Sequence, residues 1–100
     1  MLFHILISHK ILSREEILNR CNQSRQLVRI TFKDGTVKFG SFEHLGDYGD
    51  LKRNDMYRFV CSDKENEFRV SLFNKLKADI SLSIIIMVDD IENIELVIPL

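Results

Sequence analysis

The chain lacks an excess of charge of either sign: 14 Lys and Arg residues stand against 15 Asp and Glu residues, for a net charge of −1 over 100 residues. Composition therefore does not indicate nucleic-acid binding through a strong positive field. No run approaches the ~20 apolar residues of a membrane-spanning helix. The apolar start MLFHILISHKIL (1–12) has no leading positive charge and no small-residue cleavage site, unlike an export signal. We therefore expect a cytoplasmic protein.

Motifs for catalysis and metal binding are also lacking. The sequence contains no HExxH, no GxSxG and no phosphate-binding loop. Cys21 and Cys61 lack CxxC spacing, so we expect two reduced thiols rather than a disulfide or a metal site. His4 and His9 are five residues apart and would not share one face of a helix or a strand. We expect no enzyme activity, no cofactor, no metal and no small-molecule substrate.

What is present is the composition of one soluble globular domain, with 45% apolar and 29% charged residues. The sequence predicts a helix start at Ser13, because Glu16 follows three residues later in the spacing of a capping box. Ile17, Leu18 and Cys21 then fall on one face, which predicts a short helix with one apolar stripe. Residues 1–12 are ambiguous between a strand and an extension of this helix.

From Leu27 the apolar period becomes two, which predicts a strand up to Phe32 and a hairpin turn at Asp34-Gly35. A two-residue type I′ turn would place Phe32 opposite Val37 and Arg29 opposite Gly40, with Phe39 on the apolar side. Beyond Gly40 the apolar side of the strand changes. A glycine at that crossover indicates a corner or bulge, the device by which short chains build small barrels.

The remaining strands are predicted from short apolar segments. We expect strands over 56–61, 68–72, 83–88 (a buried run) and 94–98, a loop over 46–50 and a polar turn over 62–66, with 73–82 the least defined segment. The predicted fold is mainly β: a small bent-strand barrel of the SH3-like kind preceded by an α-helix. It forms a single domain, with residues 1–24 as the N-terminal segment and helix and residues 26–100 as the barrel.

A helix followed by about five bent strands resembles the layout of the Sm and Sm-like (LSm) proteins, and two local patterns add to this resemblance. The first Sm pattern is similar to the set Val28, Ile30, Gly35, Gly40, Phe42 and Asp47. The second is similar to IMVDDIENI over 86–94, with Ile86 and Ile94 at its ends. The two stretches cover residues 27–50 and 84–98. The resemblance implies a homo-oligomeric, ring-forming protein that binds RNA.

In Sm-like proteins, RNA contacts come from the loop after the second strand and the turn between the fourth and fifth strands. Carried onto this chain, a base would stack on Tyr48, carboxylates would accept from base edges, and cations would meet phosphate. A basic cross-strand patch with Lys33 is a second candidate for contact with a nucleic-acid backbone. The candidate residues for binding RNA or single-stranded DNA are His44, Asp47, Tyr48, Asp50, Lys52, Arg53, Arg29 and Lys38.

Ring formation in the family uses edge-to-edge pairing of the fourth and fifth strands. The last strand here is apolar and terminal, and an exposed edge of that kind is a liability unless a neighbour covers it. The predicted interface residues are Ile84, Ile86, Ile94, Leu96 and Ile98. Two alternatives stay open: the N-terminal residues cover this edge within one chain, or the barrel is a protein-interaction or structural module without nucleic-acid binding.

Overall fold

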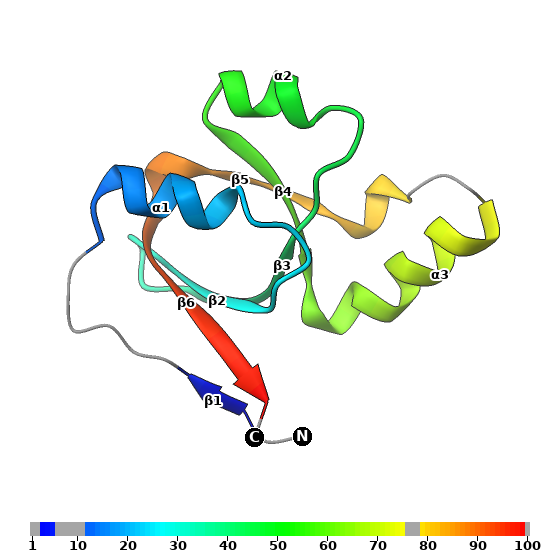
Figure 1. Cartoon of the computed structure of the whole chain (residues 1–100), viewed down its shortest axis with the longest axis horizontal. Coiled ribbons are helices and arrows are strands. Elements are labelled where there is room, and N and C mark those ends of the chain that lie inside the picture. The colour runs from blue at the N-terminus through cyan, green and yellow to red at the C-terminus, as the bar shows by residue number, and fades with distance from the viewer. Residues whose placement is uncertain (1–2, 6–11, 76–78, 100) are drawn as a thin grey trace.

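The computed structural model describes residues 3–5, 12–75 and 79–99 (Figure 1). Three α-helices are present in this part of the chain: α1 (Arg14–Cys21), α2 (Tyr48–Arg53) and α3 (Glu65–Lys75). The strands are β1 (Phe3–Ile5), β2 (Val28–Phe32), β3 (Val37–Phe42), β4 (Met56–Cys61), β5 (Ile84–Met87) and β6 (Ile91–Pro99). Short 3₁₀ turns are η1 (Ser62–Lys64), η2 (Ile80–Leu82) and η3 (Val88–Asp90).

The strands form one antiparallel sheet in the order β1-β6-β2-β3-β4-β5. Five of them make up the main sheet, and the three-residue β1 pairs only with the end of β6, at Val97–Pro99. This short pairing belongs to the segment whose structure the sequence left ambiguous. Helices and strands take up similar shares of the chain, so the prediction of a mainly β fold understated the helices.

One hydrophobic core lies between the inner face of the sheet and α1. Its largest fully buried members are aromatic, and Phe42 meets Tyr57 and Phe59 edge to face, with ring centroids 6.0 and 5.1 Å apart. Helix α1 adds Ile17 and Cys21. Burial raises the pKa of the Cys21 thiol to about 12, so it stays protonated at neutral pH.

Helix α1 begins where the sequence predicts. The Ser13 hydroxyl accepts from the Glu16 N–H and the Glu16 carboxylate accepts from the Ser13 N–H, each at 3.2 Å, which completes the capping box. Arg14 then pairs with Asp55, at 2.9 Å, and with Asp89. This single guanidinium ties the start of α1 to the residue before β4 and to η3.

The hairpin lies where predicted, but its turn type and register are wrong. Residues 33–35 form a three-residue turn in which Gly35 has φ +90°, whereas the predicted type I′ turn needs positive φ at both central positions. The ladder pairs Thr31 with Val37 and Arg29 with Phe39, one residue away from the predicted pairs. A one-residue shift moves side chains to the other face. Val37 and Phe39 are consequently exposed.

Gly40 is a point of close approach between strands β3 and β4. Strand β3 pairs with β2 up to Gly40 and with β4 from Gly40 onward. A Cβ atom at this position would lie 2.1 Å from the Val60 carbonyl oxygen and under 3 Å from the Phe59 ring. Residues before the glycine are exposed, and residues 41–43 are all buried, so both faces of the strand are covered beyond it. Only glycine allows so close an approach of β4.

The predicted strand over 68–72 is wrong, because these residues lie in α3. The segment ENEFRVSLFNK has helix-favouring glutamates in its first turn and an i,i+4 pair between Glu65 and Arg69. Arg69 also donates two hydrogen bonds, of 2.7 and 3.0 Å, to the carboxylate of the buried Glu43, which directly follows β3. Phe68 is fully buried. Tertiary contacts of this kind stabilise the helix over an alternating sequence that also fits a strand.

Three further expectations are corrected. The predicted polar turn over 62–66 is η1 and the start of α3, and the predicted loop over 46–50 contains the start of α2. The run over 83–88 does contain a strand, β5, but only Ile86 of that strand is buried. Within the least defined segment, 73–82, the helix ends at Lys75 and η2 follows, while residues 76–78 lie outside the described part. No helix of the described residues is long and apolar enough to cross a membrane.

Candidate interaction surfaces

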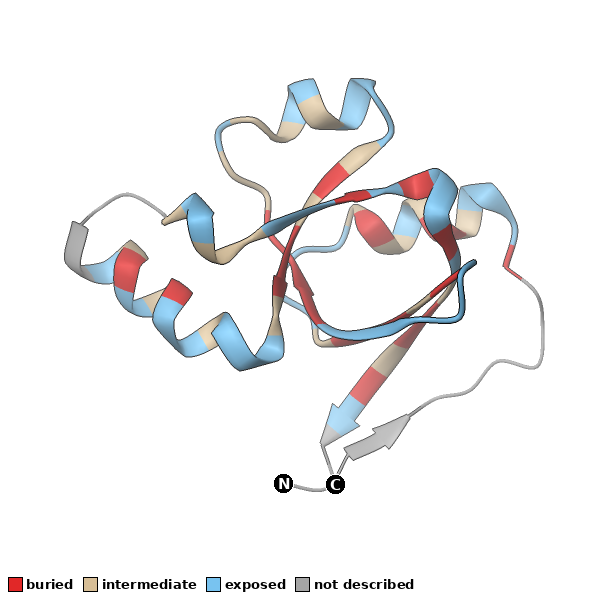
Figure 2. Ribbon diagram, turned by 180° about the vertical axis from the view of Figure 1, so that it is seen from behind, coloured by how far each residue is buried: buried red, intermediate tan, exposed pale blue. Residues whose placement is uncertain are grey.

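Strand β5 ends the sheet and exposes apolar side chains on both of its faces. Ile85 and Met87 are each 48% exposed and Ile84 is 37% exposed, whereas Ile86 is 3% exposed and points into the core. Figure 2 shows the strand running across the front of the molecule with mostly exposed residues. None of its four side chains carries a charge. An apolar edge without charge or proline lacks the usual protection against pairing with another strand.

The backbone of β5 offers hydrogen-bonding groups along this edge. The Val88 N–H donates to the Asp55 oxygen at 2.9 Å, in line with the register that pairs Met56 with Met87. In an antiparallel ladder the residues that bond to one neighbour alternate with residues that face away from it. Because Val88 bonds toward β4, the N–H and C=O groups of Ile85 and the N–H of Met87 face the free edge, while the Met87 C=O accepts within η3, of which Met87 is the N-cap.

The other end of the sheet, β6, is covered differently. Ile94 is 1% exposed, and Ile98, 42% exposed, lies in the segment that pairs with β1. On the outer face, Arg29 of β2 pairs with Glu95 at 2.5 Å, and the Glu95 side chain is 4% exposed. Of the predicted interface residues, Ile86 and Ile94 are therefore core residues, Leu96 packs against the core, and Ile84 and Ile98 are accessible.

Three of the predicted nucleic-acid contacts lie together on α2 and in the loop before it. The rings of His44 and Tyr48 contact each other at a tilt of 33°, with centroids 3.9 Å apart, and the Lys52 ammonium lies 5.5 Å from the centroid of the Tyr48 ring. The Tyr48 hydroxyl donates to the Asn22 oxygen at 2.6 Å, and the Tyr57 hydroxyl donates to the same oxygen at 3.1 Å. Tyr48 is thus a half-buried link between α2 and α1 with its ring already stacked on one side.

The carboxylates of the same loop are engaged by arginines. Asp47 accepts from Arg58 at 2.5 Å, and this hydrogen bond, more than the opposing desolvation, holds the pKa of Asp47 below its usual value. Asp50 pairs with Arg53 on the exposed side of α2. Arg58 also donates to the Ser83 hydroxyl at 2.8 Å. It therefore joins the loop before α2 to the start of β5.

The predicted basic patch on the hairpin is split. Arg29 lies on the outer face with Glu95, while Lys38 is opposite Ile30, on the other face. Lys33 and Lys38 line an open cleft of about 540 Å³ with Asp34, Thr36, Asp90 and Phe32. Asp34 accepts from the Thr36 hydroxyl and N–H, at 2.7 and 2.9 Å, which lowers the pKa of Asp34. The cleft brings two cations beside two carboxylates.

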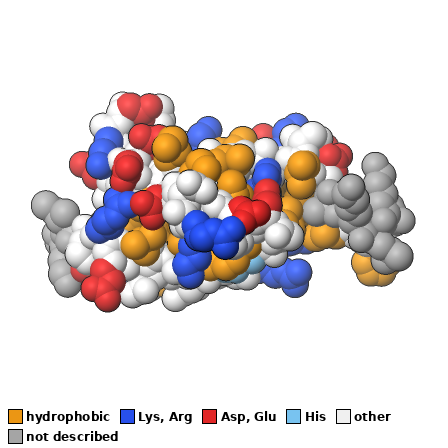
Figure 3. All heavy atoms as spheres, turned by 90° about the horizontal axis from the view of Figure 1, so that it is seen from above, with side chains coloured by type: hydrophobic (Ala, Val, Ile, Leu, Met, Phe, Trp, Pro, Cys, Tyr) orange, Lys and Arg blue, Asp and Glu red, His pale blue; other side chains and the backbone are white. Residues whose placement is uncertain are grey.

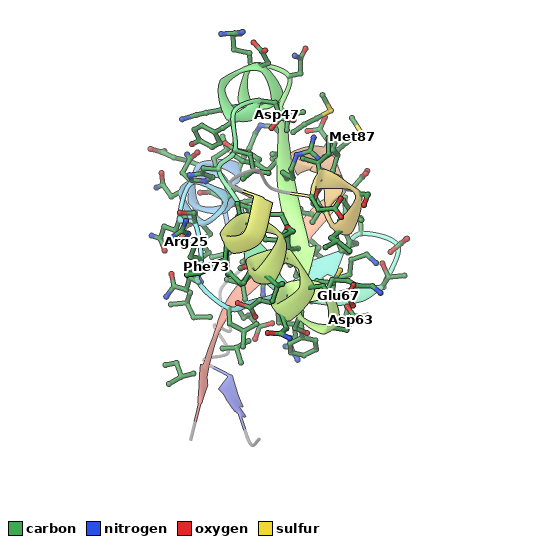
Figure 4. The ribbon with its side chains drawn as sticks, turned by 90° about the vertical axis from the view of Figure 1, so that its right-hand side faces the viewer. Arg25, Asp47, Asp63, Glu67, Phe73 and Met87 are labelled. Carbon is green, nitrogen blue, oxygen red and sulfur yellow. The ribbon has the colours of Figure 1, made fainter. Side chains whose placement is uncertain are left out.

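Charges elsewhere are mixed in the same way. On the face seen from above, which includes α2, Lys and Arg side chains alternate with Asp and Glu rather than forming one basic surface (Figure 3). Apolar exposure is also divided. Phe73, 86% exposed on α3, and Met87 lie on opposite sides of α3 in Figure 4. The exposed edge of β5 and the exposed end of α3 are therefore separate features.

Sequence reasoning missed two residues that organise these surfaces. Asn22 follows α1 and accepts from two tyrosines, and Arg58 of β4 donates to Asp47 and to Ser83. Neither role has a local signal, because the partners lie 11 to 35 residues away. Among the described residues, no group of three or more His, Cys, Asp or Glu side chains is arranged to hold a metal ion. Cys21 and Cys61 are free.

Comparison with known proteins finds no match: no family model fits the chain, and no curated protein or solved structure is significantly similar to it.

Proposed function

We propose that this protein is a non-catalytic interaction module that associates with copies of itself by strand pairing at the free edge of β5. The observation that carries the proposal is the combination of exposed, uncharged side chains with outward-facing backbone groups at Ile85 and Met87. Pairing with another strand satisfies those backbone groups and removes apolar surface from water. The bent antiparallel sheet and the preceding helix also support the Sm-like layout. We include the closure of this sheet into a barrel in the proposal.

The edge is short, which sets the expected strength of association. Four residues provide much less than the about 1,200 Å² of buried surface found in stable complexes. We therefore expect a concentration-dependent equilibrium rather than a permanent oligomer.

Native mass spectrometry and light scattering between about 1 μM and about 1 mM test this, a range that spans weak complexes. The mass should rise with concentration for the wild type. Ile85→Lys should remain monomeric, because a charge at the edge opposes pairing. Val70→Lys is the matched control, since Val70 is equally exposed, at 48%, but lies on α3. A wild-type monomer at every concentration, or equal loss in both variants, would contradict the proposal.

The second candidate function is binding of RNA or single-stranded DNA by the associated protein, as the Sm-like resemblance implies. It is favoured by the convergence of Lys33 and Lys38 on one cleft and by the stack of His44, Tyr48 and Lys52. It ranks second because Asp34 and Asp90 also line the cleft, and because Met87-Val88 stand where the second Sm pattern has Arg-Gly.

Fluorescence anisotropy with a labelled single-stranded RNA, and with the same sequence as DNA, tests the second candidate. Binding through phosphate should weaken steeply between low and moderate salt. A variant carrying Lys33→Glu and Lys38→Glu should lose binding. If bases stack on Tyr48, Tyr48→Ala should also weaken binding relative to the wild type. Tyr48→Phe, which keeps the ring, should not. No binding at low salt would eliminate this candidate and leave the first intact.

A further inference from the structure

We infer that the self-association proposed above, on which this inference rests, is a two-fold dimer. In it, β5 pairs antiparallel with β5 of a second copy, and Ile85 lies opposite the partner's Met87. The result differs from the head-to-tail ring expected from the Sm-like resemblance, in which β5 would pair with β6 of the next copy.

The first step concerns which strand is free to pair with β5. The edge of β6 that faces away from β2 is already occupied at Val97–Pro99 by β1 of the same chain. The rest of β6 carries Glu92 and Glu95 within six residues, and Arg29 holds Glu95 on the outer face. Charged side chains are a common protection of sheet edges. Within residues 3–5, 12–75 and 79–99, β5 has neither a covering strand nor a charge, so a second β5 is the better partner.

The second step concerns symmetry. When a strand pairs with its own copy in antiparallel fashion, a two-fold axis relates the two chains, and the same patch is used on both. The dimer is closed, because each copy has used its free β5 edge. The two five-stranded sheets would then join into one continuous sheet across the axis.

The third step fixes the register from the backbone. The outward-facing groups are the N–H and C=O of Ile85 and the N–H of Met87, and the Met87 C=O, which accepts within η3, keeps a second lone pair. With Ile85 opposite the partner's Met87, the Met87 N–H of each copy donates to the Ile85 C=O of the other, and the Ile85 N–H faces the partner's Met87 C=O. Ile86 then lies opposite the partner's Ile86. All outward groups of the strand are satisfied in this arrangement.

Neighbouring registers are less favourable. With Ile85 opposite the partner's Ile85, Met87 would lie opposite the partner's Ser83, which precedes β5 and whose N–H already donates to the Ile80 oxygen at 3.1 Å. A shift in the other direction would use Asp89, which lies in η3 and not in a strand. A shift by one residue would set outward groups against inward ones. Only the register with Ile85 opposite Met87 uses strand residues alone.

The fourth step is the fit of the side chains. Ile85 and Met87 project from the same face of β5, and each is 48% exposed in one copy. Directly opposite side chains in an antiparallel pair are in contact. In the proposed register each exposed isoleucine meets a methionine of the other chain, so two apolar pairs cover each other without bringing like charges together.

Thiol crosslinking tests the register, in a Cys61→Ser background so that the half-buried native thiol does not interfere. Ile85→Cys and Met87→Cys are made as separate variants, mixed in equal amounts and oxidised gently. The mixture should give a covalent dimer, since opposite residues of a hydrogen-bonded pair are about 5.5 Å apart between Cα atoms, within disulfide reach. Each variant alone should crosslink several-fold less, because the cysteines of its two copies would lie diagonally across the strand pair and not directly opposite each other.

Each outcome decides a different point. A crosslink in the mixture together with a dimer mass by native mass spectrometry supports the inference. Efficient crosslinking of Ile85→Cys alone would overturn the register. A complex of three or more copies without the mixed crosslink would overturn the two-fold dimer but leave the proposed self-association. A monomer at every concentration would overturn both. Retained thermal unfolding of each variant shows that a negative result does not come from misfolding.

Discussion

The two ends of the sheet, β5 and β6, are both rich in isoleucine but differ in charge and in surroundings. β6 (Ile91–Pro99) has β2 along one side, β1 at its end and an ion pair across its outer face. β5 (Ile84–Met87) has β4 on one side and, among the described residues, no strand on the other. Hydrophobicity favours a strand at both places, while the neighbours decide whether that strand is covered or exposed.

The largest effect should come from breaking the sheet between the two ends. Gly40→Ala would place a Cβ atom 2.1 Å from the Val60 oxygen, where backbone must move to relieve the overlap. We expect a loss of about 3 kcal/mol or more in the free energy of unfolding. Urea denaturation measures it. Gly46→Ala is the control, since nothing lies within 4 Å of that Cβ position, and a similar loss there would contradict the explanation.

The next effect distinguishes the buried side chains of Ile86 and Ile94 from the exposed side chain of Ile85. Ile86→Ala removes a core side chain and should cost about 2 to 4 kcal/mol, and Ile94→Ala in β6 should cost about the same. Ile85→Ala, on the exposed side of the same strand, should cost about 0.5 kcal/mol or less. Urea unfolding at a low protein concentration makes the comparison. Equal costs at 85 and 86 would mean that the free edge is buried in the monomer.

A further effect should appear at the ion pair of β6. Arg29→Met leaves the Glu95 carboxylate, 4% exposed, without its cation, and we expect a loss of about 3 kcal/mol. Replacing the partner as well, with Glu95→Leu, should recover most of that loss because no charge then remains buried. Thermal unfolding of the two variants provides the test. A double variant as unstable as the single one would show that the pair is needed for packing and not for charge balance.

The smallest effect is a pH dependence near the start of β5. The Arg58 guanidinium lowers the pKa of Asp47, so Asp47 stabilises the fold fully above its unfolded pKa of about 4 and loses that contribution as the pH falls through the lowered value. Asp47 is 39% exposed, so solvent screening limits the contribution to about 0.5 kcal/mol. Urea midpoints of wild type and Asp47→Asn should differ at pH 7 and approach each other as the pH falls below the unfolded pKa of about 4. A constant difference would assign the effect to something other than ionisation.

Local signals predicted some elements well. The capping box at Ser13 and Glu16 placed α1, and the apolar segment 56–61 placed β4, because each depends on residues close in sequence. The hairpin was located by Asp34-Gly35, but its register depends on a distant contact. The Lys33 N–H donates to the Asp90 oxygen at 2.9 Å, so Lys33 belongs to the turn and the ladder moves by one residue.

The candidate surfaces were harder to predict for the same reason. Arg29 and Lys38 share a face only in the wrong register, and Tyr48 is held by Asn22, which is 26 residues away. The strand expected over 68–72 became α3, since Arg69 reaches Glu43 and Phe68 is buried. Alternation of apolar and polar residues over five positions is compatible with both elements.

The sequence by itself determined where helix α1 starts, where the chain turns at Gly35, and that an apolar strand lies between Ser83 and Asp89, because capping, positive φ and β-branched side chains act over a few residues. The tertiary structure alone decided which apolar strand is covered. Pairing of β1 with Val97–Pro99 occupies one end of the sheet and leaves Ile85 and Met87 at the other. Coverage depends on strands distant in sequence meeting in space, and no short stretch of residues encodes that meeting.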